Sequence, residues 1–336
     1  TGCSATAWPG SGIYTVCLPE REATHVRAPQ EHILYSRFTR YSVPHISTGI
    51  PLLAIAIKLI RAKQLALATL ALPVLLFLGC TAPQHRAEQI AEQAGFNRQL
   101  VTGEGFKHVV YEHGLSAQPI AKLHIYIGGD GTPWVAGRYP SADPTPRQPL
   151  ALTLMSEDPT PAIYLGRPCY FGLAASANCS VALWTSRRYA PEVVASMLRV
   201  IRQYQQNYGA ENIVLIGYSG GGTLAALIAR DLQPDVFLLT IAANLDTEMW
   251  SDLHGYLPLT GSLNPAHYRG DTAQLPQLHL AGLKDEAVPV AVTRSYSAGL
   301  APSSSRYYPT FDHSCCWLEL WPDILAEKPW STSGAE

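Results

Sequence analysis

The sequence has little charge, and no long run of basic residues interrupts it. Of its 336 residues, 15% are charged, and the formal net charge is −2. Nucleic-acid-binding proteins usually carry a clustered basic surface, so this composition gives no reason to expect such a partner. The hydrophobic share of 47% is enough for one large α/β domain, or two smaller ones, with a substantial core.

Methionine is also scarce, and none precedes Met155. The stretch 1–57 shows no sustained helix or strand period. We interpret 1–57 as a non-native extension, translated from upstream of a true start that lies between Ile50 and Leu59. An ordinary disordered N-terminal extension is the alternative.

A long apolar run is missing as well. The run at 65–78 is shorter than the roughly 18–20 residues needed to span a bilayer, and Pro73 interrupts it. A basic cluster at 58–63 precedes it and Gly79-Cys80 follows it, which is the order of parts in a secretory signal. We therefore expect 58–80 to be a signal peptide. A buried helix or an uncleaved membrane anchor is the alternative.

The end of this segment, Leu78-Gly79-Cys80, resembles a bacterial lipobox, in which the cysteine is lipidated and becomes the mature N-terminus. The resemblance implies a lipoprotein that is exported and anchored to a membrane of the bacterial cell envelope, facing the periplasm. The polar segment 81–99 is then expected to be a tether that passes into a short helix, and 100–336 to be the folded domain.

The clearest motif is Gly217-Tyr218-Ser219-Gly220-Gly221, which follows a short β-branched apolar run and precedes an Ala/Leu-rich segment. This G-x-S-x-G pattern predicts a strand, a tight turn that carries a serine nucleophile, and a helix. A P-loop would need a lysine after its last glycine, but Thr223 follows Gly222. The G-x-G-x-x-G fingerprint of dinucleotide-binding proteins is absent after this strand.

A second glycine-rich turn, Gly128-Gly129-Asp130-Gly131, follows an apolar run at 123–127 that we expect to be a strand. When such a turn lies upstream of a nucleophile elbow, it supplies a backbone N–H to the oxyanion hole. We therefore expect the N–H of Gly129 or Asp130, together with that of Gly220, to bind the oxyanion. A plain glycine-rich turn that Asp130 caps is the alternative.

Two further residue types complete a possible catalytic triad. Asp285 follows a predicted strand at 278–282, and His313 lies in the loop after the last predicted strand. A serine hydroxyl needs a histidine to take its proton and a carboxylate to orient that histidine. Asp246 and Asp312 are the rivals for the acid; Asp312 adjoins His313, and neighbouring side chains usually diverge.

Two pairs of cysteines are candidates for disulfides. Cys169 and Cys179 lie close together in a Gly/Ser/Ala-rich loop, which predicts a disulfide in an exported protein. For Cys315 and Cys316 we leave open a vicinal disulfide that would stiffen the loop of His313, or two free thiols. The histidines at 108–113 have the order H-x-x-x-E-H, which is not the H-E-x-x-H of zinc peptidases, so we expect no metal and no cofactor.

Residues from about Leu100 onward are similar to the α/β-hydrolase superfamily, and to exported bacterial members of uncharacterised substrate. The resemblance is carried by Ile127–Trp134, Gly217–Gly222 and Asp312–Trp317. It implies the α/β-hydrolase fold, and the alternation of predicted strands and helices independently favours a largely parallel central sheet with helices on both faces.

The expected function is that of a serine hydrolase that cleaves small carboxylic esters through an acyl-enzyme on Ser219, His313 and Asp285. Two alternatives stay open. One is a thioesterase or peptidase with the same triad, and the other is a non-catalytic binding protein on the hydrolase fold. The sequence does not indicate an oligomeric state.

Overall fold

The computed structural model describes residues 82–115, 119–301 and 304–331. The predicted extension at 1–57 and the predicted signal peptide at 58–80, with Cys80, lie outside the described residues. Within the described ranges, no helix is both long and apolar enough to cross a membrane.

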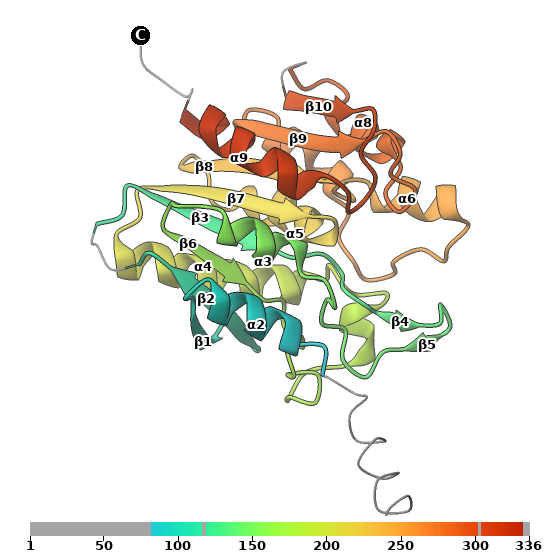
Figure 1. The fold of residues 1–336 in the computed structure, drawn as a ribbon. Coiled ribbons are helices and arrows are strands. Elements are labelled where there is room, and N and C mark those ends of the chain that lie inside the picture. Colours follow the sequence, from blue (N-terminus) through green and yellow to red (C-terminus); the bar gives the residue numbers. More distant parts are fainter. Residues whose placement is uncertain (1–81, 116–118, 302–303, 332–336) are drawn as a thin grey trace, which may run out of the picture. The chain divides into compact units, whose positions relative to one another are not determined.

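The centre of the domain is an eight-stranded sheet (Figure 1). Its strands, in spatial order, are β1 (Asn97–Thr102), β2 (Lys107–His113), β6 (Ala162–Leu165), β3 (Lys122–Ile127), β7 (Asn212–Tyr218), β8 (Val236–Ile241), β9 (Gln277–Gly282) and β10 (Ser305–Tyr308). The β1–β2 and β2–β6 pairs are antiparallel, and all the others are parallel. The expected largely parallel sheet is confirmed.

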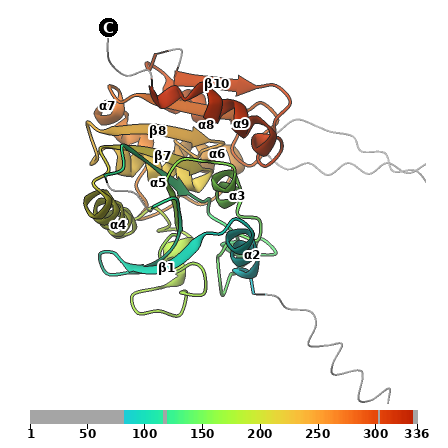
Figure 2. The same ribbon diagram turned by 60° about the vertical axis from the view of Figure 1, so that its left-hand side comes forward.

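Helices cover both faces of this sheet (Figures 1 and 2). On one face α2 (His85–Gln93) contacts α3 (Leu150–Ser156), which in turn contacts α9 (Trp317–Glu327); on the other, α4 (Pro191–Tyr208) contacts α5 (Gly220–Ala229). Because both faces are covered, β8 and β9 are buried at every residue, and their sequences read as continuous runs rather than alternating ones.

The remaining elements border the sheet. They are the hairpin of β4 (Trp134–Val135) and β5 (Tyr139–Pro140), the helices α6 (Thr247–His254), α7 (Arg269–Thr272) and α8 (Val290–Ser297), and the 3₁₀ turns Val181–Trp184, Pro265–Tyr268 and Pro329–Ser331.

The short helix expected within 81–99 is present as α2, but the structure packs it on the domain. Helix α2 contacts α3, its residues Ala87, Ile90 and Ala91 are buried, and β1 begins at Asn97. The predicted domain boundary at 100 therefore falls inside β1. The alanine- and glutamine-rich composition suggested a solvated linker, but the three apolar residues lie at helical spacing and bury one face of α2.

Candidate active site

Ser219 occupies a sharp turn between β7 and α5. Its backbone has φ 53° and ψ −125°, which is a costly conformation for a residue with a side chain. The strand and the helix pass so close that a Cβ on Gly217 would lie 2.5 Å from the Cα of Gly222. A Cβ on Gly221 would collide with the carbonyl oxygen of Ile127. The glycines are therefore needed for the turn that exposes the serine.

Ser219, His313 and Asp285 form a hydrogen-bonded chain. His313 Nε2 lies 3.1 Å from Ser219 Oγ, and His313 Nδ1 lies 2.8 Å from Asp285 Oδ2. The other carboxylate oxygen of Asp285 accepts from the N–H of Val288 at 2.7 Å. Because Nδ1–H donates to the carboxylate, Nε2 is left to accept the serine proton.

The three residues follow the carboxyl ends of β7, β9 and β10, which are parallel strands of the same sheet. One fold is characterised by a serine on a strained strand-to-helix turn, followed along the chain first by the acid and then by the histidine. The fold is that of the α/β-hydrolases.

The rival carboxylates lie elsewhere. Asp246 caps the N-terminus of α6, and its oxygens accept hydrogen bonds from the N–H of Met249, from Asn264 and from Ser295. The carboxylate of Asp312 accepts from the backbone N–H groups that follow it, and neither side chain hydrogen-bonds to His313. Of the three acids weighed from the sequence, only Asp285 contacts the imidazole.

The loop that carries His313 is held through its main chain. The carbonyl oxygen of His313 accepts from Tyr218 Oη and from Trp317 Nε1, each at 3.1 Å. Trp317 Nε1 is also 3.2 Å from the carbonyl oxygen of Asp312. The position of the imidazole therefore depends on two aromatic side chains that hydrogen-bond to the backbone of its loop.

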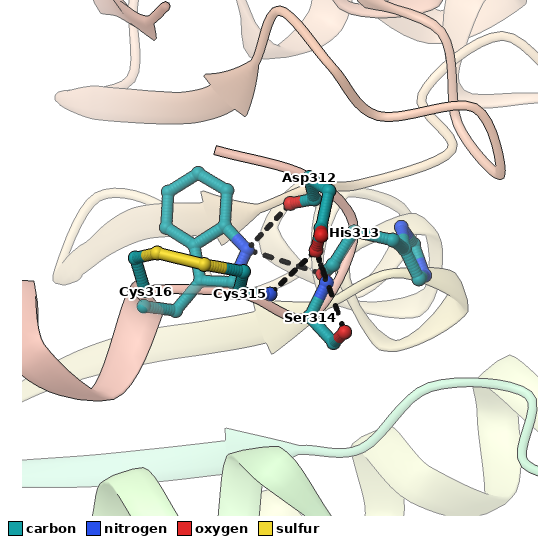
Figure 3. Close-up of a disulfide and its surroundings, with 6 residues drawn as sticks. Asp312, His313, Ser314, Cys315 and Cys316 are labelled. Carbon is teal, nitrogen blue, oxygen red and sulfur yellow. Dashed lines mark hydrogen bonds between the residues drawn. A yellow bond between two sulfur atoms is a disulfide. The ribbon is translucent and has the colours of Figure 1, made fainter. Parts of the chain in front are cut away.

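The same loop contains a disulfide between the adjacent Cys315 and Cys316 (Figure 3). Of the two states left open by the sequence, the structure has the vicinal disulfide. Asp312 Oδ1 accepts from the N–H groups of Ser314 and Cys315 at 2.8 and 2.6 Å. The imidazole of His313 points away from the sulfur atoms (Figure 3). The disulfide therefore lies in the loop that carries His313 but does not contact the imidazole.

The glycine-rich turn at 128–131 leaves β3 beside the elbow, because Ile127 pairs with Gly217. A Cβ on Gly129 would lie 3.1 Å from Ser219 Cβ and 3.5 Å from its Oγ. Within the described residues, no acceptor takes the N–H of Gly129 or Asp130. Gly220 begins α5, where the first N–H groups have no acceptor within the helix. The N–H groups predicted for the oxyanion hole, those of Gly129, Asp130 and Gly220, therefore belong to segments that lie beside Ser219.

The side chain of Asp130 has a second role that the sequence did not indicate. Its Oδ1 pairs with Arg167, and its Oδ2 accepts from Arg188 Nη1 at 2.8 Å and from Tyr189 Oη at 2.7 Å. The two arginine side chains are only 3% and 7% exposed, so the ion pairs are shielded from water. Burial alone would raise the pKa of Asp130, but the charges of Arg188 and Arg167 hold it below its ordinary value.

This Asp130 cluster, defined as Asp130, Arg167, Arg188 and Tyr189, lies directly against the elbow. A Cβ on Gly220 would be 2.6 Å from Tyr189 Oη and 2.5 Å from Asp130 Cγ. No spacing rule reveals the cluster, because Arg167 and Arg188 lie 37 and 58 positions from Asp130. Its ion pairs and hydrogen bonds join Asp130 in the turn at 128–131 to Arg167, Arg188 and Tyr189, and Gly220 at the start of α5 lies close against it.

A cavity of about 320 Å³ opens beside Ser219. It is lined by the turn at 128–132, the loop 146–150, Tyr218, Ser219 and His313. Its volume is at the lower end of the range for small-molecule sites.

The predicted disulfide partners Cys169 and Cys179 are bonded, with their Cα atoms 5.6 Å apart. Together they close a loop between Arg167 and Arg188. In the part of the chain that the structure describes, no group of three or more histidine, cysteine or acidic residues is arranged to hold a metal ion.

No protein family model matches the chain, and no curated protein does. Among solved structures, it is similar to a bacterial membrane phospholipase A described as a virulence factor, at 15% identity and TM-score 0.48, over 82% of this chain and 99% of that one. It is also similar to an esterase from Pyrococcus furiosus, at 12% identity and TM-score 0.49, over 74% and 92%. A third similar structure is an α/β serine hydrolase without a lid from Xanthomonas campestris, at 14% identity and TM-score 0.44, over 71% and 97%.

Proposed function

We propose that this α/β-hydrolase-fold protein is a serine hydrolase that cleaves carboxylic esters. The observation that carries the proposal is the 3.1 Å separation of His313 Nε2 from Ser219 Oγ, with Asp285 behind the imidazole. A serine hydroxyl is too weak an acid to ionise near neutral pH, so attack requires a base within hydrogen-bonding distance.

In the proposed reaction, Ser219 Oγ attacks the ester carbonyl carbon while its proton moves to His313 Nε2. The carbonyl electron pair shifts to oxygen and gives a tetrahedral oxyanion. Collapse breaks the bond to the alcohol, which leaves with the proton from Nε2, and an acyl-enzyme remains. Water then attacks the acyl-enzyme as His313 takes its proton, which releases the acid and restores Ser219.

The oxyanion would be bound by backbone N–H groups of Gly220 and of Gly129 or Asp130. The absence of another acceptor for the N–H of Gly129 and Asp130 within the described residues supports this assignment. The N-terminus of α5 adds the positive end of a helix dipole. Removing one such donor typically costs two to three powers of ten in rate.

A fluorophosphonate tests for the activated serine, because it reacts covalently with such hydroxyls. We expect labelling of the wild type and none in Ser219→Ala. Ser314→Ala is the matched control, because Ser314 is an exposed serine in the loop of His313. No labelling of the wild type would favour the alternative of a binding protein on this fold.

A cavity of about 320 Å³ accepts a small acyl group, which an ester, a thioester or an amide can carry. Nitrophenyl esters of graded chain length, compared with matched thioesters and anilides, separate these substrates. A higher kcat/KM for thioesters or anilides would replace the ester assignment and leave the triad in place.

We also propose that the protein is exported and anchored to a bacterial envelope membrane through a lipid on Cys80. The basic cluster, the apolar run and Leu78-Gly79-Cys80 support this proposal. Mass spectrometry of the mature N-terminus should find a lipid-modified cysteine. A mature chain that extends upstream of Lys58 would contradict it.

A further inference from the structure

Arg147 is the one cation among the residues that line the cavity beside Ser219. Its side chain is exposed, and within the described residues no hydrogen bond or ion pair holds its guanidinium. An arginine presents a planar set of donors that matches a carboxylate or phosphate. Arg147 is therefore free to bind an anion that enters the cavity.

The backbone on which Arg147 stands is fixed. The prolines on either side, Pro146 and Pro149, are buried, and the carbonyl oxygen of Pro144 accepts from the N–H of Thr132 at 2.9 Å. The Thr145 hydroxyl accepts from the N–H of Phe171. The backbone of this loop is therefore held beside the turn at 128–132, which lines the same cavity.

Among the residues that the structure describes, no acid forms an ion pair with Arg147. Asp130 also lines the cavity, but its two oxygens pair with Arg167 and Arg188. The carboxylate of Asp143, the nearest acid along the chain, accepts from the N–H and the hydroxyl of Thr145. One carboxylate shared by two buried guanidiniums also leaves the Asp130 cluster with an excess positive charge next to the cavity.

We propose that the cavity takes a small anionic ester, whose negative group pairs with Arg147 while its carbonyl lies at Ser219. This inference rests on the proposed function and specifies its substrate class. The volume of about 320 Å³ lies at the lower end of the range for small-molecule sites and so suits a small ester.

The test compares two esters that differ by one charge: the mono-4-nitrophenyl ester of adipic acid, and the same ester with its free carboxylate methylated. The measurement is the ratio of kcat/KM for the anionic ester to that for the methylated one. We expect the wild type to favour the anion about two- to fivefold, which is the gain from a partly exposed ion pair. The preference should weaken as salt is added.

Substitutions assign the preference to its residue. We expect Arg147→Gln to bring the ratio to about one, and Arg147→Glu to bring it below one. Arg138→Gln is the matched control, because Arg138 is exposed on the nearby β4–β5 hairpin and does not line the cavity. It should keep the wild-type ratio.

A second pair of esters locates the anion. Acetyl esters of 4-hydroxybenzoate and of its methyl ester place the charge on the leaving group. A preference there that Arg147→Gln abolishes would assign Arg147 to the alcohol side, still with an anionic substrate.

A ratio near one in the wild type for both pairs, or a preference unchanged in Arg147→Gln and Arg147→Glu, overturns the inference. Either result still leaves a protein that hydrolyses esters. Failure of the proposed function looks different, because no ester is then turned over and Ser219 is not labelled by a fluorophosphonate.

Discussion

Asp285 is bound through both of its carboxylate oxygens, one to the N–H of Val288 and one to His313. The first bond fixes the carboxylate and the second fixes the tautomer of the imidazole. An amide in the same place has the shape of the carboxylate but can donate its own proton to Nδ1. His313 would then carry its proton on Nε2, which faces Ser219.

Asp285→Asn should therefore lower kcat by about 10⁴-fold without unfolding the protein, as in other triads whose carboxylate becomes an amide. Nitrophenyl ester hydrolysis, with circular dichroism to check folding, measures this. Asp312→Asn is the matched control, since its side chain hydrogen-bonds to N–H groups that an amide oxygen also satisfies. Equal losses in the two variants would contradict the role given to Asp285.

The burial of His108 leads to a prediction of how the stability depends on pH. It is buried, Nδ1–H donates to the carbonyl oxygen of Gly166 at 2.9 Å, and Nε2 accepts from Ser196 Oγ at 2.7 Å. Burial lowers its pKa to about 4, although the bond to Gly166 opposes the shift. The unfolded chain takes up a proton near pH 6.5, whereas the folded chain does not until about pH 4.

The free energy of unfolding should therefore fall as the pH drops from 6.5 toward 4, by up to about 1.4 kcal/mol per pH unit from this histidine. His279, whose pKa burial lowers to about 3, adds to the loss in the same direction. Urea unfolding at pH 7 and pH 5 measures it. His108→Asn should give a smaller difference between the two pH values; an unchanged difference would mean that His108 is not kept neutral.

At the scale of elements, the Asp130 cluster joins the turn after β3, the loop after β6 and the segment that precedes α4, and Gly220 of α5 lies close against it. Arg188 Nη1 is one of two donors to Asp130 Oδ2, so removing it leaves that carboxylate oxygen with Tyr189 alone. A hydrogen bond to a charged group contributes about 1.5–3 kcal/mol. The cost should appear both in stability and in the position of the turn beside Ser219.

Arg188→Met should lower the free energy of unfolding by about 2 kcal/mol, because the Asp130–Arg167 pair remains. Arg187→Gln is the adjacent control, because Arg187 pairs with Glu192 on the surface and its loss should cost less than about 1 kcal/mol. Chemical denaturation of both variants measures the two losses in the free energy of unfolding. Similar values would show that the cluster is not a rigid support.

Short-range features of the site were predictable from the sequence, whereas long-range ones were not. The elbow was predictable because strand, turn and helix are consecutive, and Asp285 and His313 because each follows a recognisable strand. The cluster was not predictable, because its charges come from three separate segments and meet only in the folded protein. For Asp130 the sequence indicated a use of its N–H, or a cap of the turn by its side chain, but not the ion pairs with Arg167 and Arg188.

At the scale of the whole molecule, α2 belongs to the domain. Fully burying a side chain such as Ile90 contributes about 1.5–3 kcal/mol, and α2 covers part of α3. Its polar composition concealed this from the sequence, since three buried residues in nine make a weak periodic signal.

A chain that begins at Ala82 should therefore unfold at a clearly higher urea concentration than one that begins at Phe96. The second chain lacks α2 but keeps every strand of the sheet. Equal midpoints for the two chains would show that the helix is a tether after all.

The hydrogen bonds that Tyr218 and Trp317 donate to the carbonyl oxygen of His313 have a consequence for chemical rescue. Both contacts are to main chain, so His313→Ala should leave the loop in place around a vacancy the size of the lost ring. Free imidazole added to that variant would then diffuse in, sit between Asp285 and Ser219, and restore part of the esterase rate in proportion to its concentration.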